Sequence, residues 1–179
     1  MVRRKRMMKP FSWPLLRLVV MATLVGGCGS HLTGTGTGLP SHIRSVAVPI
    51  FMNSSAEPEI ELSLTEAVRD EFIEDGRLRV VAGTGADALL EGEILSYRLE
   101  GLAFDAADNI TEGRLIVEVR LKLIDQVEGD TLLDMRLPAR HEYKVSEELA
   151  AAEEARDEAE KLAFAELAAK VPGLAIEGF

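Results

Sequence analysis

The clearest strand signal in the chain is the stretch RLIVEVRLKL at residues 114–123. Its apolar side chains fall at alternate positions, Leu115, Val117, Val119, Leu121 and Leu123, and the positions between them are mostly charged. Successive side chains of a strand point to opposite faces, so this alternation predicts a strand with one buried and one charged face. The strand therefore predicts a sheet that is covered by other elements on one face only.

A hairpin and a second alternating strand follow. Residues 126–130 contain Gly129 and are short enough for a hairpin, so the next strand is expected to pair antiparallel. The alternation resumes at Leu133, Met135, Leu137, Ala139, Tyr143 and Val145. Pro138 has no N–H to donate, and it predicts either a bulge or an edge position for this strand.

The last element is predicted to be a helix that begins near Ser146 and runs to Lys170. This segment is rich in Ala, Glu and Leu, which are strong helix formers, and Pro172-Gly173 is expected to end it. Its apolar positions form a narrow stripe of Leu149, Ala152, Ala159, Leu162, Ala163 and Leu167.

Upstream of residue 114 the sequence predicts a strand, a helix, a short extended piece and a long strand. The first strand covers residues 45–51, where Pro49 again implies an edge or a bulge. The helix begins near Pro58, ends at Gly76, and carries its apolar residues at helical spacing: Ile60, Leu64, Ala67, Val68 and Phe72. Residues 77–81 are extended. In the long strand at residues 88–102, Leu89, Leu95, Tyr97 and Leu99 share one parity, and Gly92, Ser96 and Arg98 the other.

This order, β-α-β-β-β-α, predicts an α+β two-layer sandwich with about four strands in a mixed sheet and both helices on one face. The other face is then charged and locally basic. It is either simply solvated or a binding surface for a partner or an anionic lipid. The candidate binding residues on it are the cations Arg98, Arg114, Arg120, Lys122, Arg136, Arg140 and Lys144.

The N-terminal residues have the layout of a secretory signal peptide. A cationic opening precedes a short apolar stretch, and the stretch from Trp13 to Gly27 is too short and too interrupted for a spanning helix. Val25-Gly26-Gly27-Cys28 has small residues directly before the only cysteine, which is the pattern of a bacterial lipobox. We therefore expect a signal peptide at 1–27, an acylated Cys28 with a Gly/Thr-rich flexible tether to residue 42, and a single domain at 43–179.

Charge and anchoring follow from that processing. The whole chain has 20 Lys and Arg against 30 Asp and Glu. Loss of the six basic residues before Cys28 leaves 14 against the same 30, a net charge of −16. Such a chain repels nucleic acid and anionic surfaces overall, so we expect no nucleic-acid partner and membrane attachment through the lipid.

The sequence offers no catalytic or metal-binding set. His31, His42 and His141 lack zinc-site spacing, no serine-nucleophile elbow is present, and the lipid consumes the cysteine. A cluster of Asp105, Asp108 and Asn109 lacks the glycine and distal glutamate of a calcium loop, so it is expected to be a solvated turn. Neither an enzyme activity, a metal nor a cofactor is predicted.

Several segments together resemble the lipopolysaccharide-assembly lipoprotein family LptE. They are Cys28-Gly29-Ser30-His31-Leu32, residues 43–51, 53–58, 76–81 and 86–94, and Tyr97, in the order of that family. The resemblance implies an outer-membrane lipoprotein on the periplasmic side that sits inside the β-barrel LptD and helps place lipopolysaccharide in the outer leaflet. Gly29 and Ser30, in place of an aspartate after Cys28, are what lipoproteins forwarded to the outer membrane usually show.

One loop departs from the family pattern. The resemblance implies that basic residues around a strand-joining loop engage lipopolysaccharide phosphates. Here the loop at residues 104–112 carries Asp105, Asp108 and Glu112 and no basic residue, and carboxylates repel phosphate. The alternative to the barrel-plug role is a lipid-anchored scaffold of another envelope complex that does not bind lipopolysaccharide.

Overall fold

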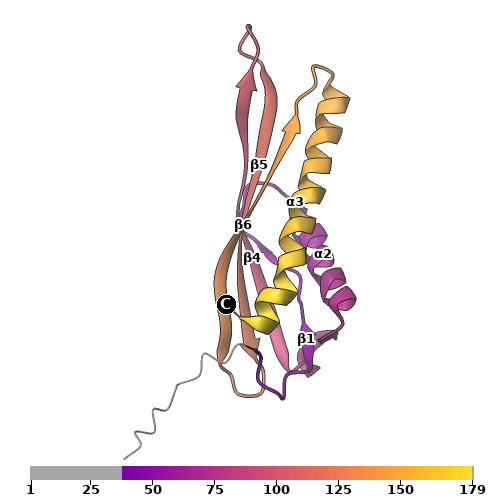
Figure 1. The fold of residues 1–179 in the computed structure, drawn as a ribbon, viewed down its shortest axis with the longest axis vertical. Helices are drawn as coiled ribbons and strands as arrows, with labels where there is room; N and C mark the ends of the chain where they lie inside the picture. Colours follow the sequence, from indigo (N-terminus) through magenta and orange to yellow (C-terminus); the bar gives the residue numbers. More distant parts are fainter. Residues whose placement is uncertain (1–37, 179) are drawn as a thin grey trace, which may run out of the picture. The chain divides into compact units, whose positions relative to one another are not determined.

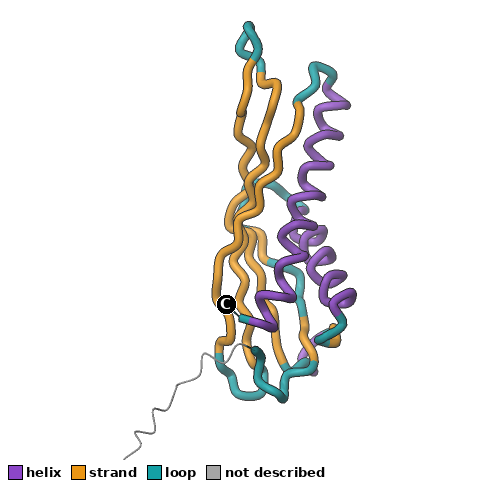
Figure 2. The backbone as a smooth tube through the Cα atoms, viewed as in Figure 1, coloured by secondary structure: helices purple, strands orange, loops and turns teal. Residues whose placement is uncertain are grey.

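The computed structural model describes residues 38–178, and this part of the chain folds as the predicted two-layer α+β sandwich (Figure 1). The helices α2 (Ile60–Asp75) and α3 (Leu149–Glu177) contact each other and cover the same face of the sheet. Figure 2 shows the loops at the two ends of the long strands. No helix within the described residues is long and apolar enough to cross a membrane.

The sheet contains six strands, whereas the sequence predicted about four. Its order is β3 (Arg79–Val80), β1 (Ser45–Ala47), β4 (Ala88–Phe104), β5 (Ile110–Asp125) and β6 (Thr131–Lys144). A further strand, β2 (Met52–Asn53), pairs with β4 beside this path. The pairs of β1 with β3 and β4 are parallel, and β4, β5 and β6 form an antiparallel meander.

The strand β5 forms the middle of the core, as its alternation predicted. The side chains on its helix-facing side, Leu115, Val117, Val119, Leu121 and Leu123, are fully buried. They pack in one cluster with Leu64, Val68 and Phe72 of α2 and with Leu167 and Val171 of α3. Burying apolar side chains from both helices on one strand joins the two layers into one core.

The predicted first strand is divided in two around Pro49. β1 ends at Ala47 and β2 begins at Met52, and β1 lies inside the sheet between β3 and β4. Of the two predicted alternatives, an edge position is therefore wrong and an interruption of the strand is observed. For Pro138 the predicted edge position is observed, because β6, the strand that contains it, lies at the edge of the sheet.

The strand β4 changes the face of its buried residues along its length. The prediction placed Leu89 on the same side as Tyr97, but the fully buried hydrophobic residues of the first half are Ala88, Leu90 and Ile94. The register with β5 shifts between Ile94 and Ser96, and beyond that irregularity Tyr97 faces the core. A bulge inserts one residue and exchanges the two faces, which a single alternation pattern does not anticipate.

The helix α3 continues to Glu177, so the prediction that Pro172-Gly173 ends it is wrong. A proline inside a helix removes one backbone hydrogen bond and costs about 3 kcal/mol or more. Here Val171, Pro172 and Ala175 are buried against the core, and this packing holds the last turns in place. At the other end of α3 the predicted stripe does not hold, because Leu149 is 73% exposed.

The helix α2 agrees more closely with its prediction. It ends at Asp75, and Gly76 follows in the left-handed conformation with φ 69°. Of the predicted apolar residues, Ile60, Leu64, Val68 and Phe72 are buried and Ala67 is half-buried. Its start differs, because Pro58 lies before the first helical residue, Ile60.

Candidate binding face on the sheet

The sheet face opposite the helices carries the seven cations that the sequence singled out. Strand pairing places them on β4, β5 and β6 in registered cross-strand rows. As many carboxylates share this face, namely Glu91, Glu93, Glu100, Glu112, Glu118, Asp134 and Glu142. The face is therefore mixed in charge, and its basic character depends on which cations already have partners.

Three of the seven cations form ion pairs across the strands. A guanidinium nitrogen of Arg114 lies 2.6 Å from Glu142, one of Arg120 2.7 Å from Asp134, and one of Arg136 3.6 Å from Glu118.

The pair of Arg120 and Asp134 is bidentate. Nε and Nη2 of Arg120 donate to the two oxygens of Asp134 at 2.8 and 2.7 Å. This hydrogen bonding lowers the pKa of the Asp134 carboxyl and raises that of Arg120. Both groups are therefore already committed to each other.

Four candidate cations form no ion pair with a described residue: Arg98, Lys122, Arg140 and Lys144. Two of them, Arg98 and Arg140, lie in one cross-strand row on either side of Ile116. Their backbones are two strand spacings apart, about 10 Å. Ile116 is only 8% exposed, as expected where arginine stems lie along an apolar neighbour. This row joins two guanidinium groups around an apolar centre.

The tip of the β4–β5 hairpin is apolar, a feature that the sequence prediction did not single out. Four side chains there are exposed by 36 to 57%: Leu99, Leu102, Phe104 and Ile110. Phe104 and Ile110 lie over the backbone of Gly101, where a Cβ would meet the Phe104 ring at 2.9 Å. The sequence could have indicated this apolar tip, because two apolar residues, Phe104 and Ile110, flank the polar turn.

The turn itself is closed by Asp105, in agreement with the prediction of a solvated turn. Asp105 Oδ1 accepts the backbone N–H groups of Ala107 at 2.7 Å and of Asn109 at 3.0 Å, and Oδ2 accepts the Asn109 side-chain amide at 2.9 Å. These hydrogen bonds, that of the Asn109 side chain first, lower the pKa of Asp105. Within the described residues, no group of three His, Cys, Asp or Glu side chains could hold a metal ion.

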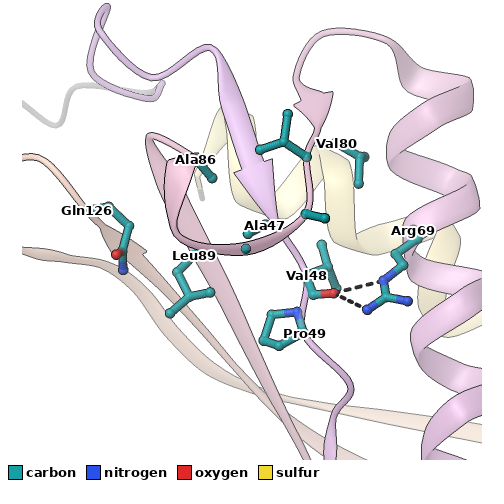
Figure 3. Close-up of a pocket in the computed structure, with 11 residues that line it drawn as sticks. Ala47, Val48, Pro49, Arg69, Val80, Ala86, Leu89 and Gln126 are labelled. Carbon is teal, nitrogen blue, oxygen red and sulfur yellow. Dashed lines mark hydrogen bonds between the residues drawn. The ribbon is translucent and has the colours of Figure 1, made fainter.

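An apolar pocket of about 590 Å³ lies between the end of β1, β3 and the short 3-10 helix η1 (Gly83–Gly85) (Figure 3). Arg69 lies at its margin, and its Nε and Nη2 donate to the Val48 carbonyl at 2.8 and 2.6 Å (Figure 3). The other lining residues are Ala47, Pro49, Val80, Val81, Ala82, Gly83, Ala86, Leu89 and Gln126. This lining has neither a nucleophile nor an acid–base pair, so the pocket is suited to apolar contact and not to acid–base chemistry.

A second hollow of about 310 Å³ lies at the end of the charged face, next to β2. Its lining joins Pro49 and the exposed side chains of Ile50 and Met52 to two cations and two carboxylates: Arg120, Lys122, Glu91 and Glu93. Apolar groups are therefore adjacent to a surface of mixed charge here. Cys28, the remaining predicted site, lies outside the described residues.

Comparison with solved structures shows the same fold in other proteins. The hypothetical protein CT253 from Chlamydia trachomatis is 13% identical, covers 74% of this chain and 98% of its own, and superposes with a TM-score of 0.54. A minor lipoprotein from Acinetobacter baumannii is 13% identical with coverages of 76% and 92% and a TM-score of 0.52. Protein XCC0632 from Xanthomonas campestris is 14% identical with coverages of 76% and 88% and a TM-score of 0.52.

Sequence comparison identifies the family. No curated protein sequence matches this chain. The family model LptE, described as lipopolysaccharide-assembly, matches residues 43–171, which is most of the chain. The match begins at the start of the folded region and ends in α3. The chain therefore belongs to the LptE family of lipopolysaccharide-assembly proteins.

Proposed function

We propose that this protein is a lipid-anchored subunit on the periplasmic side of the outer membrane, where it serves as plug and assembly partner of an LptD-type β-barrel. Its membership of the LptE family supports a role in lipopolysaccharide assembly. It acts by binding and not by catalysis. Acylation at Cys28 supplies the attachment to the membrane, and no cofactor takes part.

The observation that carries a lipopolysaccharide-binding role is the row of Arg98, Ile116 and Arg140. Lipopolysaccharide presents phosphates next to acyl chains. Guanidinium groups bind phosphate in a bidentate manner, and the strand register places Arg98 and Arg140 in one row on either side of Ile116. Neither arginine is held by a carboxylate among the described residues, so neither must exchange an internal ion pair for the ligand.

The acidic hairpin tip does not share this role. Its turn carries Asp105 and Asp108, and Asp105 is fully engaged in closing the turn. In this protein we therefore assign phosphate contact to the middle of the sheet face. The hairpin tip contributes apolar side chains.

The double variant Arg98→Ser/Arg140→Ser tests this site. We expect it to retain about tenfold less lipopolysaccharide than the parent protein, because two charged hydrogen-bonding groups are lost. Lipopolysaccharide that co-purifies with the acylated protein is the quantity to measure. Arg79→Ser is the matched control, because Arg79 is an exposed arginine on β3, at the edge of the sheet opposite β6 and distant from the Arg98–Ile116–Arg140 row. Equal lipopolysaccharide in the double variant and the control would contradict the site.

The partner is tested separately by purifying the acylated protein from membranes and identifying what accompanies it. We expect an LptD-type barrel. A different envelope complex, with no lipopolysaccharide bound, would instead support the alternative of a scaffold lipoprotein.

A further inference from the structure

The helix α3 extends beyond α2 and leaves a helix position over the sheet vacant. The C-terminal ends of the two helices lie level, because Arg77, which follows α2, pairs with Glu177 of α3 at 2.6 Å. α3 has 29 residues and α2 has 16, so at about 1.5 Å per residue α3 reaches about 20 Å further. Figure 1 shows α2 beside only the lower part of α3. Among residues 38–178, no helix therefore lies next to residues 149–161 on the side that α2 occupies lower down.

The floor of this vacant position is the part of the sheet near the β4–β5 hairpin. Leu99 pairs with Leu115, which is buried in the core, so both side chains point to the helix-facing side. Phe104 and Ile110 lie over Gly101, two residues further along β4 on that side. Leu99, Phe104 and Ile110, which we call the hairpin floor, are exposed by 46, 57 and 44%. An apolar surface is thus open to solvent on the face that the helices cover elsewhere.

The wall of the vacant position is the first part of α3, and it is strongly acidic. Residues 147–160 contain seven carboxylates and a single cation, Arg156, which lies 3.8 Å from Asp157. The seven are Glu147, Glu148, Glu153, Glu154, Asp157, Glu158 and Glu160. The turn of the hairpin adds Asp105 and Asp108. An apolar floor beside an acidic wall is complementary to an amphipathic segment whose polar side is basic.

Glu160 lies at the lower end of the vacant position. It is half-buried, and it accepts a hydrogen bond from the Tyr97 hydroxyl at 3.0 Å. Burial raises the pKa of the Glu160 carboxyl, the Tyr97 hydrogen bond opposes this, and the charges of Asp157 and Glu57 raise that pKa further. Arg156 acts in the opposite direction but forms its ion pair with Asp157. A half-buried carboxylate with carboxylate neighbours is a position that a cation from outside would stabilise.

We propose that a basic amphipathic helix of a partner protein docks in this position, in line with α2 and beside α3. Its apolar side lies on the hairpin floor, and a lysine or arginine reaches Glu160. A helix of about 13 residues fills the length of about 20 Å. An anionic lipid does not fit, because the acidic wall repels phosphate.

The vacant position needs only one copy of the chain. It lies on the side of the sheet opposite the row of Arg98, Ile116 and Arg140. The proposal is therefore independent of lipopolysaccharide binding, and it is consistent with a single chain that serves as a plug.

Binding of a synthetic peptide tests the position. The probe is a fluorescent helical peptide of about 14 residues, with leucine along one helical face and lysine elsewhere, and its counterpart carries glutamate in place of every lysine. We expect the acylated protein in non-ionic detergent to bind the lysine peptide at least about tenfold more tightly, because of the acidic wall. Fluorescence anisotropy measures both affinities, with detergent micelles alone as the blank. Equal affinities for the two peptides would overturn the proposal.

Two variants locate the bound peptide. Glu160→Gln removes the charge but keeps an acceptor for the Tyr97 hydroxyl, and Leu99→Ser makes the hairpin floor polar. We expect each to weaken binding of the lysine peptide about five- to tenfold. The matched controls are Glu128→Gln and Val127→Ser, at exposed positions of the β5–β6 turn, and they should leave the affinity nearly unchanged. Losses no larger in the two variants than in the controls would mean that the peptide binds elsewhere, and the assignment would fail.

Crosslinking in cells identifies the partner. A benzophenone amino acid in place of Leu99 is expected to give a photoadduct with a protein, and mass spectrometry should map the link to an amphipathic helix with lysines or arginines on its polar side. The same amino acid in place of Val127, on the β5–β6 turn, should not give that adduct. An adduct with lipid alone, a link to an acidic segment, or no adduct at Leu99 would each contradict a basic helix as the occupant.

Discussion

Among single residues, Asp125 at the end of β5 joins the start of the folded domain to the β5–β6 turn. It is fully buried, and Oδ2 lies 2.7 Å from His42 Nε2. Oδ1 accepts the backbone N–H groups of Val127 at 2.7 Å and Glu128 at 3.0 Å. Burial raises the pKa of the Asp125 carboxyl, but the two backbone hydrogen bonds and His42 outweigh it and lower that pKa below its ordinary value.

We expect Asp125→Asn to lower the free energy of unfolding at pH 7 by about 1–3 kcal/mol, because the amide cannot accept the same charged hydrogen bonds. A carboxyl with a lowered folded pKa stabilises the protein above its unfolded pKa of about 4, and this contribution is lost as pH falls through the folded pKa. The difference between the variant and the parent should therefore shrink below pH 4. Urea unfolding over a pH series measures it.

The matched control is Asp130→Asn, because Asp130 is an exposed carboxyl in the same turn. It should leave the stability nearly unchanged at every pH. A constant difference between Asp125→Asn and the parent from pH 7 to pH 3 would show that the charge of Asp125 is not what stabilises the turn.

Alternation in the sequence predicted which side chains of β5 face the core, but it did not predict which charges pair. Leu115 and Leu123 are buried as expected. The partner of Arg114 is Glu142, 28 residues later, and the register between strands decides that pairing. The prediction could therefore identify seven candidate cations, but not which of them lack a carboxylate partner.

At the scale of elements, α3 shows where local sequence rules fail. Pro172 is an ordinary helix stop, and the sequence gives no local reason to continue past it. The continuation depends on Val171 and Ala175, which are buried in the core shared with β5 and α2. The β4 bulge is a similar case, because the shift between Ile94 and Ser96 is visible only in its pairing with β5.

We expect the C-terminal half of α3 to carry most of its contribution to stability. Val171→Ala removes two buried methyl groups and should lower the free energy of unfolding by about 2 kcal/mol. Leu149→Ala, at an exposed position in the first turn, should change it by less than about 0.5 kcal/mol. Chemical denaturation of both variants measures the contrast. Equal losses at the two positions would mean that the first turns of α3 are anchored as firmly as the last.

At the scale of the whole molecule, the fold class and the family could be predicted from sequence, and the number of strands could not. The long strands could be predicted because their apolar residues alternate with polar ones over many positions. β2 and β3 contain two residues each, which is too short for any periodic pattern. They become strands only because β1 and β4 offer edges on which they can pair.

The proposed lipid anchor gives a prediction for the whole protein. Cys28→Ala removes the thiol that accepts the lipid, so we expect a folded protein that is released from membranes. Fractionation of cells, together with circular dichroism of the released protein, measures this. A variant that stays in membranes with its signal peptide attached would show that the apolar run at residues 15–25 is the anchor.

The position of β1 has a mechanical consequence for an anchored protein. The chain enters the described domain next to its far end, where the Leu39 N–H donates to the Ile176 carbonyl at 3.2 Å, and it then continues into β1. β1 pairs with a strand on each side, with β3 and with β4. A pull along the strand loads its hydrogen bonds in shear, so that they resist together and are not peeled apart one at a time. Tension that enters from the N-terminal side would therefore meet the Leu39–Ile176 contact first and then β1, which lies inside the sheet.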